Sequence, residues 1–169
     1  MSQPGGQIHW RTRAWANIWL ILHESGLISA DEIRKSILNL EDESNDYPQA
    51  WQLTSSGQDD DLILGLHMLA NHILSWESLG PLLGNLLEGM VVGNYSIHQV
   101  MKAMTVITEE TASGKFSLHD SVKRDFDRDP TTMSGLVTAY QAVLSGQPSE
   151  SLAEFQDRVD TWLMGYGTP

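Results

Sequence analysis

Apolar residues recur every three or four positions along most of the chain, which is the spacing of one face of an α-helix. The densest such stretch runs from 60 to 92, where two apolar segments meet at Gly80-Pro81. Proline suits the first turn of a helix, so this stretch predicts two consecutive helices that form a central apolar hairpin. Weaker helical stripes are predicted at 9–25, 29–40, 96–111, 117–127, 131–144 and 151–165.

No segment alternates apolar and polar residues in the way that a half-buried strand does. About eight helices joined by short connections therefore predict an all-α fold, a single compact multi-helix domain around the central hairpin. We place this domain at 9–165. The residues before it, 1–8, are rich in Gly, Pro and Gln and are expected to be disordered, and 166–169 are expected to fray.

Charge is distributed unevenly along the chain, whose formal net charge is −12. The region 36–101 contains no Lys or Arg but nine acidic residues. A surface of negative potential repels nucleic-acid phosphates and favours cationic partners, so no direct nucleic-acid binding is expected. Simple solubility is the alternative explanation for such a surface.

A tryptophan-rich segment near the start is the second candidate for an interaction surface. Tryptophan and arginine are common anchors of protein interfaces, although three tryptophans within ten residues also suit a buried helix. Together the two features give these candidate interaction residues: Trp10, Arg11, Arg13, Trp15, Glu41, Asp42, Glu43, Asp46, Asp59, Asp60 and Asp61.

The sequence contains no cysteine, so it can form neither a disulfide framework nor a thiolate metal site. No charged and apolar leader opens the chain, and polar residues interrupt its longest apolar run. We therefore expect a cytoplasmic protein that does not enter a membrane. Its partner should be another protein with a basic surface, and a homo-oligomer is also possible.

Six histidines raise the question of a metal site. His67 and His72 are five residues apart, which is not the i, i+4 spacing of a zinc-binding HExxH helix. We expect these two side chains to be satisfied by hydrogen bonds, with no metal or other cofactor bound.

A second set of residues resembles the skeleton of the HD phosphohydrolases: His98 in SIHQVMKAM, the doublet His119-Asp120 in SLHDSVK, and a later Asp157 or Asp160. The resemblance covers at most 96–160. It implies an all-α, metal-dependent phosphohydrolase in which these four residues hold a divalent cation that acidifies a water molecule.

The leading hypothesis is a non-enzymatic protein-binding module that uses its acidic surface as an adaptor, a regulator or inhibitor, or a component of a viral or phage assembly. The HD-like phosphohydrolase is the first alternative, and a homo-oligomeric structural protein is the second. Binding through the acidic face should weaken as the salt concentration rises.

Overall fold

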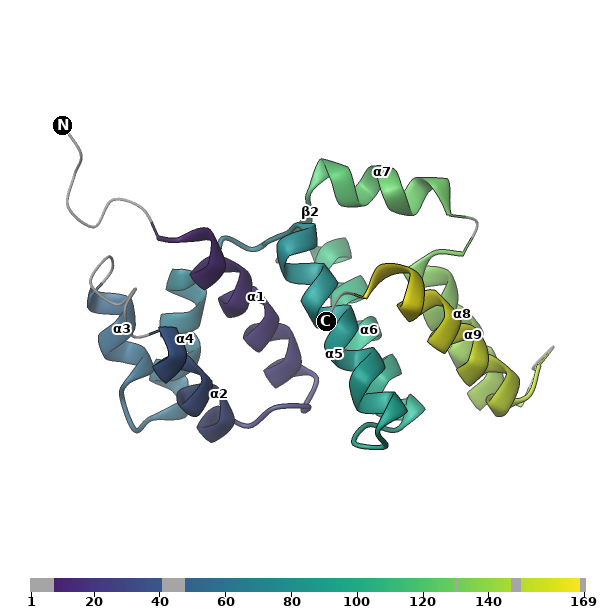
Figure 1. Ribbon diagram of the computed structural model, residues 1–169, viewed down its shortest axis with the longest axis horizontal. Helices are drawn as coiled ribbons and strands as arrows, with labels where there is room; N and C mark the ends of the chain where they lie inside the picture. Colours follow the sequence, from purple (N-terminus) through teal and green to yellow (C-terminus); the bar gives the residue numbers. More distant parts are fainter. Residues whose placement is uncertain (1–7, 41–47, 130, 147–149, 168–169) are drawn as a thin grey trace.

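The computed structural model describes residues 8–40, 48–129, 131–146 and 150–167, and most of them are helical. Within these ranges the chain forms nine helices: α1 (Trp10–Glu24), α2 (Ala30–Ile37), α3 (Pro48–Thr54), α4 (Asp59–Leu69), α5 (Trp76–Val91), α6 (Ile97–Ser113), α7 (Asp120–Arg128), α8 (Met133–Leu144) and α9 (Leu152–Tyr166). They form one compact all-α domain, as predicted. The helices α2, α3 and α4 lie at one end and α8 and α9 at the other (Figure 1).

The first helix, α1, lies at the centre of the packing. It contacts α4, α5 and α6, and Figure 1 shows it between α4 and α5. The sequence predicts one buried stripe on this helix, containing Trp15, Ile18, Trp19 and Leu22. Neighbours on several sides instead bury most of α1 from Ala14 to Leu22, although Trp15 is partly exposed.

The apolar stretch 60–92 forms two helices, but the break between them differs from the prediction. α4 ends at Leu69, and α5 begins at Trp76 and continues through Gly80-Pro81. Pro81 is the sixth residue of α5, where it removes one backbone hydrogen bond from the helix. The helix continues because burial of its leucines against the core outweighs that loss: Leu79, Leu82, Leu83 and Leu86 are fully buried.

Asn17 of α1 explains why the chain turns after Leu69. This side chain is fully buried, and its Nδ2 donates to the Asn71 Oδ1 at 2.9 Å and to the Ile73 carbonyl oxygen at 3.1 Å. Its Oδ1 accepts a 3.1 Å hydrogen bond from the backbone N–H of His72. Polar groups of the irregular backbone between α4 and α5 therefore hydrogen-bond to a side chain of α1. The periodicity of the sequence does not predict this contact.

Two short strands correct the prediction that the chain contains none. β1 (Ile73–Leu74) pairs in parallel with β2 (Ser117–Leu118). The helix predicted at 117–127 consequently begins later, at Asp120, with His119 as its N-cap. Both strands are too short to display the alternation by which a sequence predicts a strand.

The residues that cap the helix starts are easier to predict from the sequence than the connection between α4 and α5. Ser96 with Gln99 and Ser151 with Glu154 form complete capping boxes, and Thr132 caps α8 through the N–H of Gly135. These short-range hydrogen bonds satisfy N–H groups that a helix start leaves free.

The domain bounds predicted from the sequence, 9–165, remain a prediction. Residues 1–7 lie outside the described part, and α9 extends through Tyr166, one residue beyond the expected end. No helix among the described residues is both long enough and apolar enough to cross a membrane.

Candidate functional site

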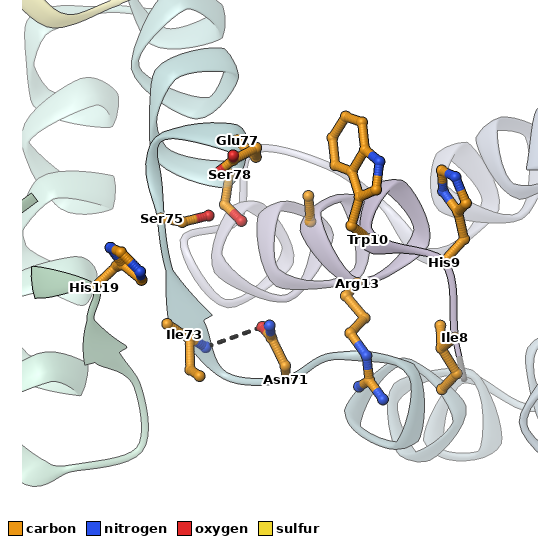
Figure 2. Close-up of a pocket in the computed structure, with 11 residues that line it drawn as sticks. Ile8, His9, Trp10, Arg13, Asn71, Ile73, Ser75, Glu77, Ser78 and His119 are labelled. Carbon is orange, nitrogen blue, oxygen red and sulfur yellow. Dashed lines mark hydrogen bonds between the residues drawn. The ribbon is translucent and has the colours of Figure 1, made fainter. Parts of the chain in front are cut away.

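A cleft of about 650 Å³ lies where the start of α1 meets the start of α5, and we call it the α1 cleft. Figure 2 shows side chains from three parts of the chain around it. Its lining comprises Ile8, His9, Trp10, Arg13, Ala14, Asn71, Ile73, Ser75, Glu77, Ser78 and His119. Two of the candidate interaction residues, Trp10 and Arg13, are among them.

Trp10 is the most prominent apolar group of the cleft, because 59% of its surface is exposed. It is the first residue of α1, whose N-cap His9 accepts a 3.2 Å hydrogen bond from the Arg11 N–H through Nδ1. The rings of His9 and Trp10 lie 5.6 Å apart. An exposed indole at the edge of a cleft provides a large contact surface for a partner.

Glu77 provides the negative charge of the cleft from the first turn of α5. Hydrogen bonds from the Ser75 hydroxyl and from its own backbone N–H lower the pKa of this exposed carboxyl group, and His119 contributes to the same shift. A carboxylate is also stabilised by the dipole at a helix N-terminus. Glu77 therefore stays ionised at neutral pH.

Arg13 lies in the other half of the cleft, on the lower side of Figure 2 with Asn71, while Trp10 and Glu77 are on the upper side. Its guanidinium donates a 3.3 Å hydrogen bond to the carbonyl oxygen of Leu69, the last residue of α4. A cation at the end of a helix satisfies a free carbonyl group and complements the helix dipole. Part of the role of Arg13 is thus structural.

The other two candidate residues of the first helix lie in a different hollow. Arg11 and Trp15 line a cavity of about 360 Å³ together with Trp19, and the Trp15 and Trp19 rings stack at 5.8 Å. Trp15 is 38% exposed. The tryptophan-rich segment therefore does not form one surface.

The acidic candidates are only partly described. Glu41, Asp42, Glu43 and Asp46 lie outside the described residues. Asp59, Asp60 and Asp61 form the first turn of α4, where Asp59 makes a 2.8 Å ion pair with Arg34 and Asp61 accepts a 2.8 Å hydrogen bond from Ser56. Two of these three carboxylates thus have partners within the chain.

The structure does not bring the HD-like set together. His98 hydrogen-bonds through Nδ1 to the Tyr140 hydroxyl between α6 and α8, whereas His119 caps α7 by accepting from the Ser121 N–H at 3.1 Å. Asp120 is exposed in α7, and Asp160 belongs to α9. No three His, Asp or Glu side chains in the described ranges are placed to hold one ion, so His98, His119, Asp120 and Asp160 do not converge on one site.

A second polar cavity of about 460 Å³ lies on the other side of the segment 71–75, and we call it the His67–His72 cavity. Its lining comprises Leu20, His23, Glu24, Ile63, His67, His72, Glu110, Lys115 and Phe116. Nδ1 of His67 and Nε2 of His72 are 2.9 Å apart, and burial lowers the pKa of both side chains. The two neutral rings therefore share one N–H···N hydrogen bond.

Two glutamates, Glu24 and Glu110, also line this cavity. A hydrogen bond with Glu110, together with burial and the Glu110 charge, raises the pKa of Glu24 to about 7. Glu110 is only 5% exposed, and its Oε1 lies 3.5 Å from the Lys115 Nζ. Two carboxyl groups in contact cannot both ionise easily, so this pair retains a proton near neutral pH.

Sequence reasoning did not predict this cavity. Glu24 and Glu110 are far apart in the chain, and nothing in either local sequence marks them. The pairing of His67 with His72 depends on the connection after α4, in which His72 has a left-handed backbone with a φ of 58°. The neighbouring residue Asn71, which often tolerates such a conformation, gives the one local hint of a turn at this point.

Comparison with known proteins finds no matching family model, curated protein or solved structure. The geometry of the two cavities is therefore the basis for inferring function.

Proposed function

We propose that the protein is a protein-binding module whose α1 cleft takes a basic side chain from a partner protein. The observation that carries this proposal is the presence of the exposed indole of Trp10 and the ionised carboxylate of Glu77 in the lining of one open cleft. An aromatic face and a carboxylate together suit a cation, because the ring attracts it through its quadrupole and the carboxylate through its charge.

Arginine fits this pair of groups better than lysine. A guanidinium is planar, so it can stack on the indole of Trp10 while its N–H groups bond to the carboxylate of Glu77. The charge distribution supports the same partner, because Glu77 belongs to the region 36–101, which lacks Lys and Arg. The negative potential of this region would speed the approach of a basic protein.

Selection of random peptides on the immobilised full chain tests the proposal without knowledge of the natural partner. We expect enrichment of peptides that contain arginine beside apolar residues. Glu77→Gln and Trp10→Ala should each weaken the selected peptides by about tenfold, the factor that corresponds to ~1.4 kcal/mol. Peptide affinity should also fall as ionic strength rises from about 0.01 to 0.15 M.

Glu88→Gln is the matched control, because Glu88 is an exposed acid of the same helix that does not line the α1 cleft. Peptides without basic residues, or peptides that bind Glu77→Gln as tightly as the wild type, would contradict the proposal. Light scattering of the free protein separates this function from homo-oligomeric assembly.

A further inference from the structure

We propose that His67 and His72 form a binding site for one transition-metal ion that favours imidazole ligands, with Cu²⁺ bound most tightly. The site lies in the His67–His72 cavity, and this proposal does not rest on the function proposed for the α1 cleft. Nδ1 of His67 and Nε2 of His72 face each other at 2.9 Å, and the two rings are nearly parallel, with 10° between their planes.

The separation of the two nitrogens is set by their hydrogen bond in the free protein, and it is also compatible with two adjacent ligands of one ion. An imidazole nitrogen binds such metals at about 2.0–2.1 Å, so two nitrogens 2.9 Å apart subtend about 90° at a shared ion. This is the angle between adjacent ligands in square-planar or octahedral coordination, whereas a tetrahedral ion needs about 3.3 Å between them. Copper(II) and nickel(II) prefer tetragonal geometry with nitrogen ligands.

The two rings would have to rotate away from their shared hydrogen bond to direct both lone pairs at one ion. The torsion that turns a histidine ring about its Cβ–Cγ bond has a broad energy profile.

The backbone of His72 is held firmly in an unfavourable conformation. Its φ of 58° makes it the one residue other than glycine with a positive φ among the described residues. Its N–H donates to the Asn17 Oδ1 at 3.1 Å, and its carbonyl oxygen accepts from the Ser117 N–H at 2.8 Å. Left-handed backbone costs about 1 kcal/mol for a residue with a Cβ, and residues held in that way are concentrated at functional sites.

The surroundings leave room for the other ligands of an ion. The cavity measures about 460 Å³, and the Phe116 ring lies 5.3 Å from that of His72 on one side. No three suitable side chains in the described part of the chain are placed around one point. Water or a small ligand would therefore complete the coordination, which leaves open positions of the kind that catalytic metal sites have.

Titration of the full-length protein with CuCl₂, followed by native mass spectrometry and electron paramagnetic resonance, tests this site. We expect one ion per chain with two nitrogen ligands from imidazole. His67→Ala and His72→Gly should each weaken binding by more than about tenfold, because one remaining imidazole loses the chelate.

His72→Gly also separates metal binding from folding. Glycine adopts a positive φ without strain, so this variant should melt at or above the wild-type temperature while it loses the ion. His98→Ala is the control, since His98 does not line this cavity, and it should retain copper. Binding that persists in the double variant of His67 and His72, or no ion bound at tens of micromolar CuCl₂, would overturn the proposal.

Discussion

The α1 cleft and the His67–His72 cavity share one wall, the segment from 71 to 75, and they use its opposite faces. Asn71, Ile73 and Ser75 line the cleft, whereas His72 lines the cavity and Leu74 is fully buried. Four residues of this short connection therefore line the two sites, and the left-handed backbone of His72 directs its side chain away from the cleft.

The two sites differ in how their polar groups are satisfied. In the cleft, Trp10 is largely exposed and Glu77 is an exposed carboxylate. In the cavity, His67 bonds to His72 and Glu24 bonds to Glu110. Groups that face outward suit a macromolecular partner, and groups that pair with each other in a small cavity suit an ion or another small ligand.

Among changes at the two sites, disruption of the segment 71–75, which lines both of them, should lower the free energy of unfolding most. Asn17→Ala removes the hydrogen bonds to Asn71, Ile73 and His72 and leaves buried polar groups unpaired. The free energy of unfolding should fall by about 3 kcal/mol, measured by urea denaturation. Asn94→Ala, at an exposed turn, is the control and should change it by less than about 0.5 kcal/mol.

The Glu24–Glu110 pair of the His67–His72 cavity should make the free energy of unfolding depend on pH. Because the pKa of Glu24 is raised to about 7 in the folded protein, its contribution is present below the ordinary value of 4.5 and is lost as pH rises through 7. After allowance for solvent screening we expect about 1 kcal/mol.

Glu24→Gln should remove this dependence while it retains a hydrogen bond to Glu110. The measurement is the difference in unfolding free energy between wild type and variant across pH 4.5 to 7. Glu88→Gln, an exposed acid that is not among the groups acting on Glu24, is the matched control. An unchanged profile in Glu24→Gln would show that the carboxyl pair does not share a proton.

Removal of the Cβ from His72, whose backbone is left-handed, should have a smaller effect and should raise the free energy of unfolding. His72→Gly removes the strain of a Cβ but adds flexibility to the unfolded chain and loses the bond to His67. The net result should be an increase of about 0.5 kcal/mol in unfolding free energy, measured by thermal denaturation. A clear decrease would mean that the histidine pair stabilises the fold, which would weaken the case for a site.

The smallest change in stability is expected in the cleft. Trp10 is 59% exposed, so Trp10→Ala should alter the unfolding free energy by no more than about 0.5 kcal/mol even though it weakens peptide binding. The matched comparison is Trp19→Ala, since Trp19 is 5% exposed in the core and its truncation should cost about 3–5 kcal/mol. Similar losses in both variants would place Trp10 in the core instead.

Local patterns in the sequence are sufficient for the helices and for part of the cleft. Hydrophobic periodicity, capping residues and helix-terminating glycines depend on residues within a few positions of one another. The three tryptophans within ten residues predict Trp10 as an interaction residue. The break after Leu69 depends on Asn17, which reaches it from another helix. The histidine pair was missed because a spacing of five separates two side chains on a regular helix, whereas α4 has already ended at His72.

The parallel pairing of β1 with β2 joins the two sites mechanically. The Ser117 N–H bonds to the carbonyl oxygen of His72 at 2.8 Å, and the His119 N–H bonds to that of Leu74 at 3.0 Å. A ligand that moves His119 in the cleft thus pulls on the same backbone that positions His72. Thermodynamic linkage then requires reciprocity: the factor by which a bound ion changes peptide affinity must equal the factor by which the peptide changes affinity for the ion.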